Sequence, residues 1–185
     1  MAHQVPDNLA LELPRKVILR RPELAKLMSV VASECAGLEA DLTWLYATLL
    51  GKYLPHNQRN GPPIHPIGFQ IFNAVESTNK RLQLIESLAG TLAIKTPLLR
   101  ELKRDISPLV KDAFKKRNTL VHAYWAVHED RYPDALIKIS PDGGLLAYAA
   151  SDFNQAIDVI VQASCAIQKF EDKVRKHLRW KKRPR

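Results

Sequence analysis

The densest polar chemistry in the sequence lies in KKRNTLVHAYW, residues 115–125. Within this segment Arg117 and His122 are residue types that suit metal-free chemistry on a phosphodiester. A histidine can take or give a proton near neutral pH, and an arginine offers a planar fork of N–H donors that matches phosphate. The chemistry that this pair could support is transfer of the 2′-hydroxyl proton of RNA, with fixed positive charge where the phosphate gains charge.

The spacing of these residues sets a geometric condition. On a helix Asn118 and His122 are four residues apart and share a face. Arg117 and His122 are five residues apart, about 140° around the helix axis, which disfavours direct contact. A loosened helix end, the long arginine side chain or a second subunit would have to close the gap.

Each residue also has a structural interpretation. Arg117 continues a run of surface charge, Asn118 can bond local backbone near a helix end, and His122 suits a core or helix-terminal position. Tyr124 and Trp125 fit core positions as well as a platform for stacking bases.

The hexapeptide RNTLVH, residues 117–122, resembles the signature of the HEPN superfamily, in which an Arg and a polar residue precede a His on one helix of a small bundle. Many members are metal-independent ribonucleases, often with the site at a dimer interface, and include toxins and antiviral effectors. Other members are non-catalytic nucleotide-binding or protein-interaction modules. The resemblance implies a catalytic pair, Arg117 and His122, with RNA-binding residues at Lys116, Asn118, Tyr124 and Trp125.

The resemblance also implies partners. RNA is the expected substrate, a homodimer is the expected assembly, and an antitoxin or other regulatory protein is a further expected partner. No cofactor and no metal are expected. His128, Glu129 and Asp130 form a compact cluster without a second ligand set nearby, and the chain has neither a Gly-rich phosphate loop nor GxSxG.

Four helical patterns could hold these residues. Apolar residues recur at steps of four and three from Pro22 to Gly51, and again over residues 67–89, where Gly90 should end the helix. The intervening residues 52–66, KYLPHNQRNGPPIHP, predict a loop. Over residues 97–123 Pro108 should kink the helix, the alternative being that Ser107 caps a new helix with Pro108 in its first turn.

The period changes to two after this helix. ALIKIS and LLAYAA flank PDGG, which predicts a β-hairpin at residues 135–149. Ser151 should cap a last helix that extends to about residue 178. The predicted fold is an all-α antiparallel four-helix bundle with this hairpin inserted before the last helix. Residues 1–172 should form one domain.

Charge and hydropathy favour a cytoplasmic protein with a basic tail. Residues 173–185 carry +8 of the formal net charge of +9, so the preceding residues carry only +1. This tail could attract phosphate, or it could be a solubilising helix end. The N-terminus lacks a signal-peptide pattern, and no segment approaches the roughly 20 apolar residues of a membrane span.

Overall fold

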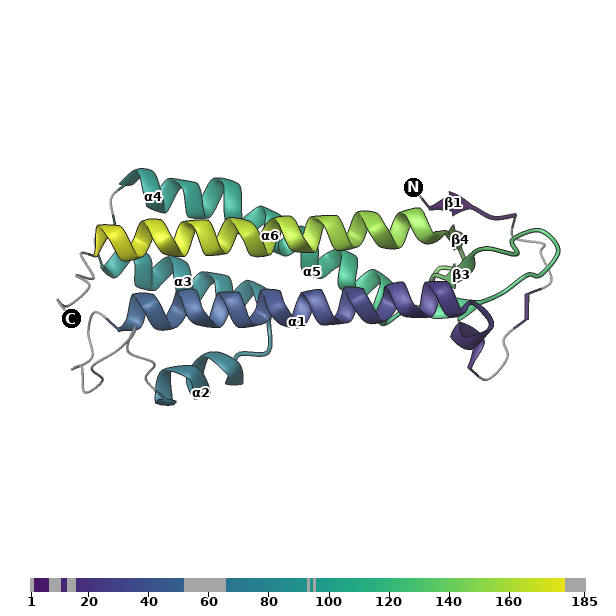
Figure 1. Cartoon of the computed structure of the whole chain (residues 1–185), viewed down its shortest axis with the longest axis horizontal. Coiled ribbons are helices and arrows are strands. Elements are labelled where there is room, and N and C mark those ends of the chain that lie inside the picture. Colours follow the sequence, from purple (N-terminus) through teal and green to yellow (C-terminus); the bar gives the residue numbers. More distant parts are fainter. Residues whose placement is uncertain are drawn as a thin grey trace. The chain divides into compact units, whose positions relative to one another are not determined.

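The computed structural model describes residues 2–6, 11–12, 16–51, 66–92, 94 and 96–178. They form a mostly helical protein with a small antiparallel sheet (Figure 1). The chain divides into two compact units, Met1–Cys35 with Ala113–Ile160, and Ala36–Asp112 with Val161–Arg185. Residues 52–65 of the predicted loop lie outside the described residues, as do residues 179–185 of the predicted tail, whereas Pro66, the last residue of that loop, begins a helix.

The first unit contains the sheet. Its strands are β1 (His3–Gln4), β2 (Tyr124–Ala126), β3 (Leu136–Ile139) and β4 (Leu145–Tyr148), in the order β1-β4-β3-β2. All pairs are antiparallel, and Leu136 lies opposite Tyr148 in the β3–β4 hairpin. The prediction of a hairpin at residues 135–149 is therefore confirmed, whereas β1 and β2 are additions that the sequence pattern did not indicate.

The hairpin turn follows from its residues. Pro141 takes the second position of a turn, and the Gly143 N–H closes this turn by donating to the Ser140 carbonyl at 2.9 Å. Gly143 has a φ of +86°, a conformation that glycine adopts without steric cost. One face of the sheet is buried through a cluster of small and aliphatic side chains, namely Val5, Ala126, Ala135, Ile137, Leu145 and Ala147.

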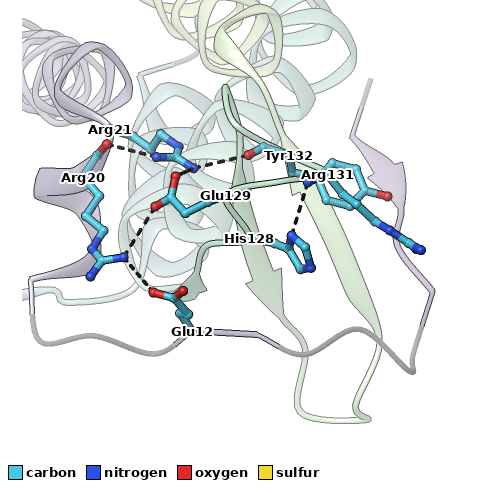
Figure 2. A network of polar contacts seen from close by, with 7 residues as sticks. All are labelled: Glu12, Arg20, Arg21, His128, Glu129, Arg131 and Tyr132. Atoms are coloured by element: carbon cyan, nitrogen blue, oxygen red, sulfur yellow. Dashed lines mark hydrogen bonds and ion pairs between the residues drawn. The ribbon is translucent and has the colours of Figure 1, made fainter.

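A polar network joins the N-terminal segment to the loop after β2 (Figure 2). Glu12 pairs with Val127 through backbone hydrogen bonds of 3.1 and 3.2 Å. Arg20, at the end of the 3₁₀ segment η1 (Val17–Arg20), donates to the Glu12 carboxylate at 2.7 Å. Arg21 donates to Glu129 at 2.9 Å, and this hydrogen bond holds the pKa of the Glu129 carboxyl below its ordinary value. This network, which we call the clasp, joins segments that are far apart in sequence.

Helix α1 (Pro22–Leu50) contributes to both units, and its predicted apolar seam is confirmed. Seven of the eight predicted seam positions are buried, and the exception, Met28, is partly exposed. The seam is buried because one helical face repeats every three or four residues. The buried positions are Leu24, Val31, Cys35, Leu38, Leu42, Leu45 and Leu49.

The single helix predicted for residues 67–89 is wrong, because two helices occupy this stretch. These are α2 (Pro66–Ala74) and α3 (Thr78–Thr91). The Arg81 Nε–H donates to the Val75 carbonyl at 2.6 Å, and the guanidinium lies 5.6 Å from the centre of the Phe72 ring. The hydrogen bond stabilises the break between the two helices, because it gives a donor to a backbone carbonyl that has left the helix. Gly90 lies inside α3, one residue before its end, and not after it.

The region around Pro108 is helical throughout, as α4 (Thr96–Glu101), the π-helical segment η2 (Leu102–Ile106) and α5 (Ser107–Val121). Ser107 has helical φ and ψ of −57° and −41°, and its hydroxyl donates to Glu86 at 2.6 Å. Ser107 is therefore not a cap that starts a separate helix. Proline lacks the N–H that an α-helix needs at this point, and the π-turn lies directly before it.

Helix α6 (Ala150–His177) begins earlier than predicted, so Ser151 is not its cap. The Asp152 carboxylate accepts the Ala149 N–H at 2.9 Å, as a residue in the first turn does in a capping box. At the other end, residues 173–177 of the predicted tail belong to α6, and Val174 is fully buried. Among the described residues, no helix is both long and apolar enough to cross a bilayer.

Candidate active site at the end of helix α5

The candidate site lies where α5 changes into β2, within the first unit. Helix α5 ends at Val121, and β2 begins at Tyr124. The His122 N–H still bonds the Asn118 carbonyl at 3.3 Å, as the last bond of the helical ladder. Because His122 itself has left the helix, the 140° separation expected on a regular helix does not apply to its side chain.

The structure brings Arg117, Asn118 and His122 together in one chain. Nη1 of Arg117 lies 2.8 Å from Nε2 of His122. The same nitrogen donates to Oδ1 of Asn118 at 2.9 Å. Of the three routes that could close the gap between Arg117 and His122, a helix end that releases His122 is the one that the geometry shows.

The hydrogen bond between Arg117 and His122 fixes the form of the imidazole. A guanidinium only donates, because arginine stays protonated at all ordinary pH values. Nε2 of His122 must therefore accept, which assigns a neutral ring with its proton on Nδ1. In this form His122 carries a basic lone pair on the nitrogen that faces the cation.

The site is open to solvent. Asn118 and His122 are exposed, and Arg117 and Lys116 are partly exposed. Tyr124, two residues beyond His122, is 80% exposed. A phosphate could therefore reach the guanidinium, and a base could lie on the Tyr124 ring, without any rearrangement of the core.

Trp125 does not belong to this exposed set, which corrects the expectation that it contacts RNA. It is 6% exposed and packs edge-to-face on Tyr148, with 5.5 Å between ring centres. Its Nε1–H donates to the Leu120 carbonyl at 3.2 Å. That carbonyl belongs to the last turn of α5, where no backbone donor follows. Trp125 is thus a structural residue that holds the helix end on which His122 depends.

The second cluster, His128, Glu129 and Asp130, is not part of the candidate site, and only Glu129 belongs to the clasp. Nδ1 of His128 accepts the Arg131 backbone N–H at 3.2 Å, and Glu129 pairs with Arg20 and Arg21 (Figure 2). Within the described residues, no group of three or more His, Cys, Asp or Glu side chains could hold a metal ion. Glu129 therefore acts by joining segments of the chain.

Comparison with known proteins finds no matching family model, no matching curated protein and no matching solved structure. The geometry of Arg117, Asn118 and His122 is therefore the basis on which a function can be proposed.

Proposed function

We propose that this protein is a metal-independent endoribonuclease of the HEPN type, with Arg117 and His122 as its catalytic residues. The observation that supports this best is the 2.8 Å contact between a guanidinium and a neutral imidazole on a solvent-accessible helix end. These two groups are a phosphate ligand and a proton acceptor, and they lie close enough to act on one phosphodiester.

In the proposed reaction, Nε2 of His122 accepts the proton of a ribose 2′-hydroxyl. The resulting oxygen nucleophile attacks the adjacent phosphorus, and the bond from phosphorus to the 5′-oxygen breaks. Arg117 and Lys116 stabilise the charge that gathers on the non-bridging oxygens. The leaving 5′-oxygen takes a proton from a general acid, and the products are a 2′,3′-cyclic phosphate and a 5′-hydroxyl.

A homodimer would supply that acid, since a second copy of the pair offers a second imidazole. We propose this assembly together with an antiparallel four-helix bundle as the arrangement of the long helices and a cytoplasmic location. The support for the bundle is the buried apolar seam of α1 and the equivalent seam of α6, which includes Ile160, Ile167, Phe170 and Val174. Such stripes are buried only when other elements pack on them.

The test uses the full chain and mixed-sequence RNA in EDTA. We expect cleavage with 2′,3′-cyclic phosphate ends. Arg117→Ala and His122→Ala should each lower the rate by about 10²–10³-fold or more, the usual cost of removing a transition-state donor. Lys115→Ala is the matched control, because Lys115 is exposed on the same helix and has no proposed role, so it should retain nearly full activity.

The outcomes also separate the alternative functions. Activity that disappears on chelation, or that survives both substitutions, would contradict the proposal. Saturable nucleotide binding without cleavage would instead identify a non-catalytic HEPN-like binding module. Binding that depends only on the basic tail would identify a helical adaptor.

A further inference from the structure

The two hydrogen bonds of Nη1 of Arg117 indicate how the candidate site is switched. Nη1 of Arg117 has two hydrogens, and the structure directs one to Asn118 Oδ1 and the other to His122 Nε2. The lone pair that a general base must use is therefore the one that Arg117 occupies. In this geometry the candidate base cannot accept a substrate proton until the arginine moves.

A phosphodiester is the ligand that can move it. Both acceptors of Nη1, an amide oxygen and a neutral imidazole, are uncharged, whereas a phosphate oxygen is anionic. A phosphate therefore adds a Coulomb attraction that the two uncharged acceptors lack, and it can pair with a guanidinium through two parallel hydrogen bonds. A phosphate that binds the Nη1–Nη2 edge of the guanidinium takes one of the two Nη1 hydrogens, so it competes with the imidazole for this nitrogen.

We infer that Arg117 is a phosphate-released cap on His122, with Asn118 as the residue that positions the cap. Asn118 Oδ1 holds the guanidinium from the same helix, one residue away, at 2.9 Å. This role replaces the expectation that Asn118 binds RNA directly. The consequence for catalysis depends on the proposed ribonuclease function, whereas the cap itself is a property of the three side chains.

The cap protects the base from unproductive protonation and frees it only where a phosphate is already bound. Nε2 of His122 would become available at the moment when the 2′-hydroxyl and phosphorus are both in place. Binding and base activation are then coupled through one hydrogen bond. A ligand without a phosphate would leave the cap closed.

The experiment observes the imidazole nitrogens of His122 directly, by long-range ¹H–¹⁵N NMR on the full chain, with His122→Gln identifying the signal. At a pH where the ring is neutral, we expect a pyridine-like Nε2 and a pyrrole-like Nδ1. The probe is a short 2′-deoxyoligonucleotide, which presents phosphodiesters but cannot be cleaved by 2′-hydroxyl attack. Saturation with it should move the Nε2 signal towards that of an unbonded pyridine-like nitrogen, because the released nitrogen loses the guanidinium donor.

Variants test each member of the cap. Arg117→Ala should show, before any probe is added, the Nε2 shift that the probe produces in the native protein. Asn118→Ala should show an intermediate shift, and Asn118→Asp, which keeps an acceptor oxygen, should resemble the native protein. Circular dichroism identifies any variant that fails to fold. If a variant does not fold, the Nε2 shift of the native protein with and without the probe still tests the inference.

Two results would overturn the inference. One is a protonated Nε2 in the native protein without the probe, and the other is an Nε2 shift that does not change at saturating probe. Neither depends on RNA cleavage. If the probe releases Nε2 but RNA stays intact, the cap is correct and the nuclease proposal is wrong. If RNA is cleaved while Nε2 does not respond, the reverse holds.

Discussion

Tyr124 offers an aromatic face to solvent next to the candidate catalytic pair. It is 80% exposed, and the neighbouring strand residue Trp125 is buried. A base stacked on an aromatic side chain contributes about 1–3 kcal/mol to binding of single-stranded nucleic acid. Tyr124→Ala should therefore weaken binding of single-stranded RNA roughly 5- to 150-fold, measured by fluorescence anisotropy at fixed salt.

Tyr124→Phe is the control, because it keeps the ring and removes only the hydroxyl. It should bind RNA almost as well as the native protein. Both variants should unfold within about 0.5 kcal/mol of it, since the side chain is exposed. Equal losses of affinity in the two variants would contradict stacking and implicate the hydroxyl.

At the residue scale, the residue types and helical frame of the sequence were enough to select Arg117 and His122, and a loosened helix end was one of the three expected routes by which they could meet. The expected angle of about 140° assumed that the helix continues through His122. It ends one residue earlier, and the contact that stabilises this end comes from Trp125, whose orientation depends on packing against Tyr148. Helix ends are set by such tertiary contacts, which a single sequence does not reveal.

The end of α5 is the element on which the geometry of the site depends. Trp125→Phe keeps an aromatic ring in the core but removes the N–H that bonds the Leu120 carbonyl. A buried carbonyl left without its donor costs about 1–3 kcal/mol. We expect the free energy of unfolding to fall by about that amount in urea titrations, and the cleavage rate to fall as well, because His122 loses its fixed position.

Tyr148→Phe is the control for Trp125→Phe, because it changes a neighbouring aromatic residue but keeps the hydrogen bond to the Leu120 carbonyl. Tyr148 packs against Trp125, and burial raises the pKa of its phenol. Replacing it by phenylalanine leaves the ring contact and the Trp125 N–H intact. This variant should keep the native cleavage rate. A loss of activity as large as that of Trp125→Phe would implicate the Tyr148 hydroxyl, and not the Trp125 hydrogen bond, in positioning His122.

The clasp between η1 and the loop after β2 should make stability depend on pH. Hydrogen bonding to Arg21 is the main cause of the lowered pKa of Glu129 in the folded chain. A lowered folded pKa means that the stabilisation is fully present above the unfolded value, about 4.5, and is lost as the pH falls through the folded pKa. Glu129→Gln should therefore lower the Tm at pH 7, with the difference from the native protein shrinking below pH 4.5.

Asp130→Asn is the matched control for this clasp. Asp130 is an exposed carboxylate next in sequence to Glu129. Its substitution removes the same charge without removing the pairing with Arg21, so the Tm should change little at either pH. A Tm difference for Glu129→Gln that persists unchanged at low pH would contradict an ionic clasp.

At the element scale, apolar periodicity predicted the long helices and the hairpin, because these depend on local pattern. It failed where a side chain further along the chain determines where a helix begins or ends. Arg81 stabilises the break between α2 and α3 by bonding the Val75 carbonyl, and Asp152 starts α6 by accepting the Ala149 N–H. The Asp152 contact had a sequence signal, a carboxylate three residues after Ala149, whereas the π-helical segment before Pro108 had none.

For the whole molecule, the uneven distribution of charge decides which truncation is informative. Residues 173–185 carry +8 of the +9 net charge, but the first of them are structural. Val174 is fully buried, and Lys173 pairs with Glu101 at 2.6 Å. A deletion from residue 173 would therefore damage α6 itself. Deletion of residues 179–185 removes five cations and leaves these contacts intact.

This shorter deletion tests whether the tail binds RNA. Each phosphate contact with single-stranded nucleic acid contributes about 0.7 to the slope of log affinity against log salt. Losing five cations should lower that slope by up to about 3.5, while the cleavage rate at saturating RNA stays native because Arg117 and His122 are unchanged. Anisotropy titrations from low to physiological salt measure the slope. An unchanged slope would assign the tail to solubility, and a lost rate at saturation would mean that the tail takes part in the reaction.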